Sequence, residues 1–161
     1  MIKAKDNAMF RFLIVLTIAS SLGLQGWRTL FNNFAVETMG LDGHHIGIIQ
    51  SVREIPGFLA LLAVFILILI KEHRLSALSV LILGLGIALT GLLPSFPGVI
   101  ITTLIMSFGF HYYETVNQSL TLQYFDQNTS PWVFGKMRSL GAASNIVVGI
   151  GIYFMEMLLS Y

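Results

Sequence analysis

Long apolar segments most constrain what this chain can fold into. Residues 55–70 contain no polar side chain, and residues 75–93 contain no charged one. Hydrophobic residues make up 55% of the sequence and charged residues only 11%, whereas a soluble domain carries about 25% charged residues. So few charges cannot cover a surface in contact with water. The sequence therefore indicates an integral membrane protein.

Five segments are long and apolar enough to be predicted as membrane-spanning helices. Tilted helices of such length cross a hydrocarbon core roughly 30 Å thick, and backbone groups without water partners require helices there. The predicted spans are approximately residues 9–36, 46–70, 75–93, 98–125 and 140–159. We predict an all-α fold class, a single polytopic transmembrane helix bundle over residues 1–161, with residues 126–138 as its longest connection.

The basic residues predict the orientation of the bundle. Of the nine lysines and arginines, only Arg28 and Arg53 fall in the interior of predicted spans. The others lie before or at the very start of the first span, between the second and third, or between the fourth and fifth: Lys3, Lys5, Arg11, Lys71, Arg74, Lys136 and Arg138. The positive-inside rule then predicts a cytoplasmic N-terminus, with Tyr161 outside, in a bacterial inner (cell) membrane.

The first predicted span has an alternative interpretation. Residues 1–21 have a basic start, an apolar core at residues 12–19 and small residues at 19–21, as in a cleavable signal peptide. We favour a retained helix, because its periodicity continues through Val36.

Polar side chains recur at helical spacing in the first and fourth spans, so each set lies on one helix face. These sets are Ser21, Gln25, Arg28 and Asn32, and Ser107, His111, Glu114, Gln118 and Thr121. The third span differs, with only Ser76, Ser79 and Thr90 as polar residues, and is predicted to be a lipid-facing support helix. Ionisable groups at membrane depth are expensive and indicate function, so we expect a polar pathway through the bundle.

Several of these residues, with neighbours on the second and fifth spans, form the predicted site. We expect Glu114 and His111 to couple protons, because a buried carboxyl can hold a proton and histidine titrates near neutrality. We expect no catalytic residue, no metal and no cofactor. The residues expected to line a cavity or bind a solute are Gln25, Arg28, Asn32, Gln50, Arg53, Glu54, His111, Glu114, Gln118, Arg138 and Asn145.

Structural interpretations of these charged residues stay open. Arg28 would contact an anion or solute, or form an ion pair with Glu54. The adjacent Arg53 and Glu54 would form a structural or gating pair. Glu114 and His111 would otherwise join helices by hydrogen bonds.

Aromatic, histidine and glycine residues outside this set have simpler interpretations. Trp27, Tyr112 and Tyr113 would stack on a solute or, more simply, pack or anchor at the interface. His44 and His45 indicate a solvated loop rather than a metal site. The glycines of the third and fifth spans are expected to permit close helix approach.

Three short sequence stretches, together with the order of the spans, can be compared with a known protein family. They are Ile-Lys-Glu-His-Arg-Leu at residues 70–75, Ser107-Phe-Gly109, and Phe-Gly-Lys-Met-Arg-Ser-Leu-Gly at residues 134–141. With a cytoplasmic N-terminus and a polar first, second, fourth and fifth span, this layout resembles the N-terminal half of a major facilitator superfamily transporter. The glycines of the family's turn are missing from residues 70–75, and the arginine usual in its fourth helix is missing near Gly109.

The resemblance implies a function and a larger assembly. It implies a secondary active transporter, or a fragment of one, that moves a small polar solute by alternating access coupled to protons, with Gly26, Pro56 and Gly57 easing helix bending. The resemblance covers about five of the family's twelve helices, so remaining helices or a second chain are expected as partners, beside the lipid bilayer.

Two other function classes were weighed. The alternative is a non-transporting membrane subunit or scaffold that assembles with other helices. An enzyme is not expected, because the chain has no cysteine and none of the usual hydrolase motifs. The net charge of +1 predicts no nucleic-acid partner.

Overall fold

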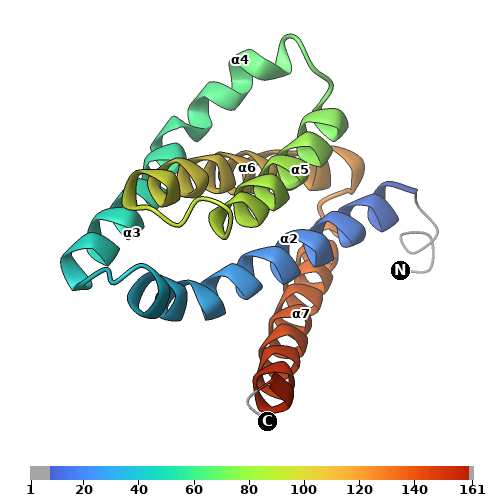
Figure 1. Cartoon of the computed structure of the whole chain (residues 1–161). Coiled ribbons are helices and arrows are strands. Elements are labelled where there is room, and N and C mark those ends of the chain that lie inside the picture. The colour runs from blue at the N-terminus through green and yellow to red at the C-terminus, as the bar shows by residue number, and fades with distance from the viewer. Residues whose placement is uncertain (1–7, 160–161) are drawn as a thin grey trace. The chain divides into compact units, whose positions relative to one another are not determined.

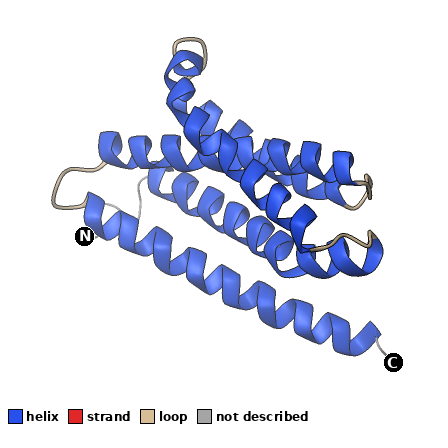
Figure 2. Ribbon diagram, turned by 90° about the vertical axis from the view of Figure 1, so that its left-hand side faces the viewer, coloured by secondary structure: helices blue, strands red, loops and turns tan. Residues whose placement is uncertain are grey.

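The computed structural model describes residues 8–159, and over this range Figures 1 and 2 show helices joined by loops, without a strand. The regular elements are α2 (Ala8–Asn33), the π-helical turn η1 (Phe34–Thr38), α3 (Gly43–Phe58), the 3-10 turn η2 (Leu59–Leu62), α4 (Ala63–Leu67), α5 (Glu72–Thr90), α6 (Phe96–Tyr124) and α7 (Ser130–Leu159). The prediction of an all-helical chain is confirmed.

Four continuous helical stretches within residues 8–159 are long and apolar enough to cross a membrane. They are Ala8–Thr38, Gly43–Leu67, Glu72–Thr90 and Ser130–Leu159. The fourth predicted span forms α6 and is not among them, since polar side chains along its second half lower its mean hydropathy. Length and composition thus give the chain the character of a membrane protein, with four candidate spans where the sequence predicted five.

The described chain divides into two compact units, one of residues 30–120 and one of the flanking segments. In the unit of residues 30–120, α5 and α6 are antiparallel and approach closely (Figure 1). A Cβ atom on Gly86 would lie 2.4 Å from the backbone nitrogen of Met106, and one on Gly109 would lie 2.3 Å from that of Leu83. Such distances are too short for any side chain, so glycine is required on both helices.

Helix α5 has one buried and one exposed face. Its exposed face carries Leu78, Leu81 and Leu85, as expected of a helix that faces lipid. Its buried face consists of Leu75, Ser76, Ser79, Leu83, Gly86 and Thr90. The few polar residues of this span therefore lie at a helix contact, where Thr90 Oγ1 lies 3.3 Å from Thr102 Oγ1 of α6.

In the other unit, residues 8–29 and 121–159, α2 contacts α7. A Cβ atom on Gly141 would lie 3.0 Å from Ser21 Oγ, so the predicted close approach at this glycine is confirmed. At one end of the contact, Phe10 stacks on Trp132 with ring centroids 5.4 Å apart. Gly149 and Gly151 have no atom within 4 Å of a built Cβ atom, so no close contact requires them.

The start of α7 differs from the sequence prediction. The connection predicted at residues 126–138 is largely helical, because α7 begins at Ser130. Asp126 Oδ1 accepts hydrogen bonds from the amides of Asn128 and Thr129, at 3.1 and 2.7 Å, and these bonds hold the turn that precedes the helix. Pro131 follows in the first helical turn, where a missing N–H costs nothing.

The second span is broken near its middle. Pro56 lies inside α3, where it cannot donate the backbone hydrogen bond of a regular helix. Shortly after it, the chain narrows into the 3-10 turn η2 before α4 continues. The 3-10 turn begins at Leu59, shortly after Pro56 and Gly57, and the role of these two residues in bending stays a prediction.

We predict that Gly86→Ala lowers the free energy of unfolding by about 1–3 kcal/mol, because its methyl group would meet the backbone of Met106. The measurement is thermal or denaturant unfolding of the purified protein in detergent. Gly84→Ala is the matched control, since no atom lies within 4 Å of its built Cβ atom and alanine favours a helix by up to about 1 kcal/mol. Equal stability of the two variants would contradict the close α5–α6 contact.

Candidate functional site

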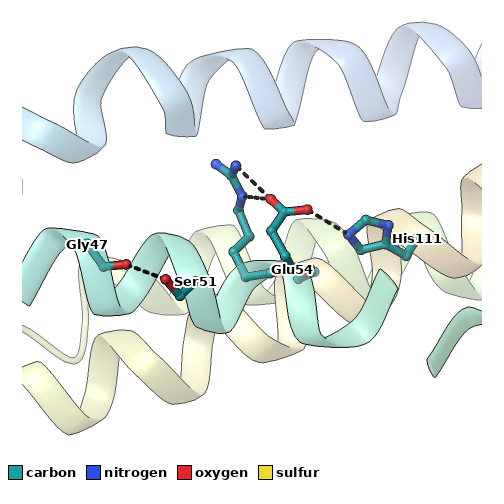
Figure 3. Close-up of polar contacts among 6 residues, drawn as sticks. Gly47, Ser51, Glu54 and His111 are labelled. Atoms are coloured by element: carbon teal, nitrogen blue, oxygen red, sulfur yellow. Dashed lines mark hydrogen bonds and ion pairs between the residues drawn. The ribbon is translucent and has the colours of Figure 1, made fainter. Parts of the chain in front are cut away.

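A carboxylate between two basic side chains forms the centre of the candidate site. On α3, Arg53 Nη2 and Nε donate to Glu54 Oε1 at 2.8 and 3.0 Å. His111 of α6 places Nε2 4.0 Å from Glu54 Oε2 (Figure 3). Protonated histidine would therefore form a second ion pair with the same carboxylate. The structure brings together three of the predicted site residues here, from the second and fourth predicted spans.

The side chains of Arg53 and His111 are partly buried, whereas that of Glu54 is exposed. The exposed fraction is 25% for the side chain of Arg53, 54% for Glu54 and 19% for His111. An ion pair on the surface of a soluble protein contributes little stability. These residues lie in or beside an apolar span. Charged groups are found there chiefly when they form ion pairs or have a function.

Helix α6 also bonds to the backbone of α3 beside this cluster. The hydroxyl of Ser107 donates to the carbonyl oxygen of Arg53. Farther along, the Tyr112 hydroxyl lies 3.4 Å from the carbonyl oxygen of Leu59 in η2. Ser107 belongs to the polar stripe predicted on the fourth span. One residue of this stripe thus supplies a hydrogen-bond donor to the backbone of the neighbouring helix α3.

The imidazole of His111 lies against a glycine. A Cβ atom on Gly57 would lie 3.1 Å from His111 Cε1 and 3.4 Å from both ring nitrogens. Since Gly57 follows Pro56 directly, the break in α3 and the space for the imidazole occur at the same place. From the sequence, bending was the only role expected for Gly57, because this contact depends on which residues of α3 and α6 face each other.

Other predicted site residues of this unit do not join the cluster. Gln50 is partly buried, and Asn32, Glu114 and Gln118 are exposed. No ion pair is found for Glu114 among residues 8–159, and the carboxylate that lies near His111 is Glu54. Proton coupling through Glu114 and His111 therefore stays a prediction, with Glu54 as an added candidate.

Four predicted site residues belong to the other unit. Gln25 donates from Nε2 to Thr29 Oγ1 at 3.2 Å, within its own helix. Arg28 and Arg138 are exposed, and Asn145 is partly buried. Because Arg28 and Glu54 lie in different units, their pairing stays a prediction.

The start of α3 carries a polar cap. Asp42 Oδ1 accepts from the amide of His45 at 3.0 Å and lies 2.7 Å from its ring Nδ1. The His45 ring packs edge-on against Phe96, with ring centroids 4.9 Å apart. His44 and His45 were expected in a solvated loop, but both lie in the first turn of α3, because Asp42 caps the helix just before them. No group of three possible metal ligands occurs within residues 8–159.

Another acidic residue lies at the start of α5. The hydroxyl group of Ser119 on α6 donates a hydrogen bond of 3.2 Å to the carboxylate of Glu72. Glu72 belongs to the charged turn compared above with the family's turn after the second helix. Its contact with α6 shows that this turn is tied to the far end of the helix that carries His111.

We predict that the cap at Asp42 is lost only in strong acid. Hydrogen bonds from the backbone and ring of His45 hold the pKa of Asp42 below its ordinary value of 3.8. A lowered pKa in the folded state means that the carboxylate stabilises the cap above its ordinary pKa and that this is lost as pH falls through the lowered value. The measurement is the amide NMR shift of His45 against pH, which should change below 3.8 and become flat in Asp42→Asn. A midpoint above the ordinary value would contradict the cap.

Comparisons with known proteins found no match: neither a protein-family model, nor a curated protein, nor a solved structure is similar to this chain. The resemblance to the major facilitator superfamily therefore stays an expectation that rests on the order of the helices and the placement of their polar residues.

Proposed function

We propose that this chain is a secondary active transporter of the major facilitator type, or a part of one, in a bacterial cell membrane. It moves a small polar solute by alternating access, coupled to protons, and works with further transmembrane helices. The observation that carries the proposal is the cluster of Arg53, Glu54 and His111 on two apolar helices. It unites a carboxylate, a titratable imidazole and a fixed cation.

The chemistry of the cluster suits proton coupling. Carboxylates and histidines are the side chains from which proton relays in membrane proteins are built, and the cluster places one of each beside a fixed cation. Alternating access requires that such a protonation event favours one conformation over another. The break at Pro56, adjacent to the cluster, supplies a place in the backbone where such a conformational change can occur.

The competing proposal is a membrane subunit that assembles other helices without transport. Both proposals accept polar residues on the helices, but only a transporter needs water to reach them. Access of water from one side of the membrane to Gln25 and Gln118 therefore distinguishes the two.

We predict that neutralising the proton-carrying carboxylate abolishes uptake against a gradient. The assay is solute-induced proton movement in proteoliposomes that hold the full transporter, with a panel of small polar solutes and a trapped pH-sensitive dye. Glu54→Gln and Glu114→Gln are compared, with Glu37→Gln, an exposed carboxylate outside the cluster, as the matched control. Loss in either Glu54→Gln or Glu114→Gln with exchange retained supports coupling. Unchanged concentrative uptake in both would refute it.

We predict that cysteines introduced at Gln25 and Gln118 react with membrane-impermeant thiol reagents. The natural chain contains no cysteine, so each variant carries a single thiol. A cysteine at Leu81, which is 70% exposed on the apolar face of α5, is the control and should react only with a lipid-soluble reagent. If both Gln25 and Gln118 behave like Leu81, the subunit proposal is favoured.

A further inference from the structure

The break in α3 lies directly beside the pair formed by Glu54 and His111. Pro56 has no N–H, so the carbonyl group of Val52 lacks the donor that a regular helix supplies. The 3-10 turn η2 then changes the backbone pattern at Leu59. The hydrogen bonds of α3 alone therefore do not fix how the two halves of this span are oriented.

Contacts from α6 fix the segment on both sides of the break. Before it, the Ser107 hydroxyl donates to the carbonyl oxygen of Arg53, the residue that precedes Glu54. After it, the His111 ring lies against Gly57, with Cε1 3.1 Å from the place where a Cβ atom on this glycine would be. Ser107 is itself only 1% exposed, so this contact is made inside the helix pair.

We propose that Ser107 and Gly57 are positioning residues for the Glu54–His111 pair, a role that rests on the proposed proton coupling. Ser107 ties α6 to the backbone next to Glu54, so it sets the height of the carboxylate along α6. Gly57 leaves the space that lets the imidazole reach toward that carboxylate. Neither residue carries a proton itself.

The separation of the pair explains why its position matters. Glu54 Oε2 and His111 Nε2 are 4.0 Å apart, whereas direct proton transfer needs about 2.6–3.2 Å or one bridging water. A shift of about 1 Å therefore decides between a direct hydrogen bond and none. A contact that fixes the position of α3 along α6 therefore controls proton transfer between Glu54 and His111.

The experiment records the ring nitrogen NMR signals of His111 in the purified chain in lipid nanodiscs. Labelled histidine is used, and the His111 signals are identified by their loss in His111→Asn. Glu54→Gln gives the shift expected when the carboxylate partner is removed. Ser107→Ala and Gly57→Ala should produce a comparable shift, and Ser107→Thr, which keeps a hydroxyl, should restore the natural signal.

Two matched controls lie on the same helix. Ser51 donates to the carbonyl of Gly47 in its own helix at 2.9 Å (Figure 3), and Gly47 has no atom within 4 Å of a built Cβ atom. Ser51→Ala and Gly47→Ala should therefore leave the His111 signals unchanged. Shifts of equal size in these controls would overturn the positioning role. They would show that any substitution in α3 is enough to shift the His111 signals.

Unchanged His111 signals in Ser107→Ala and Gly57→Ala would also overturn the proposal. Circular dichroism verifies that each variant keeps its helix content, and Ser107→Thr serves as the folded comparison if Ser107→Ala does not fold. Uptake plays no part in this readout. A chain that shows the expected shifts but moves no protons would refute the proposed transport and leave the positioning of His111 by α6 intact.

Discussion

A helix that breaks in apolar surroundings must find donors for the carbonyl groups that it releases, since lipid offers none. In this protein that requirement falls on the span of α3, η2 and α4, which Pro56 interrupts. The carbonyl group that Pro56 leaves without its helical donor is that of Val52, and the neighbouring helix α6 donates hydroxyl groups to carbonyl oxygens close to it, from Ser107 to Arg53 and at longer range from Tyr112 to Leu59. The charged cluster of Arg53, Glu54 and His111, which is built from two helices, lies beside the same break.

The cluster has a chemical logic that depends on this backbone arrangement. Arg53 holds the carboxylate of Glu54 from the same helix, while His111 approaches it from α6. The intrahelical pair can persist whatever α6 does, whereas the contact with His111 depends on the register of two helices. The contact between Arg53 and Glu54 is therefore independent of α6, whereas the contact between Glu54 and His111 depends on how α3 and α6 are placed.

Much of the fold could be predicted from the sequence, because the apolar runs are long and the turns between them are short. Helix existence and approximate bounds follow from hydrophobicity alone, as for α5. The connection expected at residues 126–138 could not be predicted correctly, since the bonds to Asp126 and the favourable place of Pro131 act locally and leave no hydrophobic signal. Helix α5 was predicted to face lipid as a whole, whereas one of its faces is buried, because composition does not reveal which face a partner helix covers.

The candidate site was predicted in part. Arg53, Glu54 and His111 were each expected from their charge at membrane depth, and the structure brings them together. The roles of Ser107 and Gly57 could not be predicted, because they depend on which residues of α3 and α6 are opposite each other. Helical spacing assigns residues to a face but does not assign the partner of that face. The choice of carboxylate partner for His111, Glu54 or Glu114, is a question of the same kind.

The two glycines of the α5–α6 contact have a mechanical consequence. Gly86 admits the backbone of α6 and Gly109 admits that of α5, so the two helices are keyed together in both directions. Sliding by one residue would bring Leu85 or Phe108 against the opposite backbone. We therefore expect α5 and α6 to move together as one rigid pair. Any internal adjustment of this unit would then occur at the break in the neighbouring span of α3, η2 and α4.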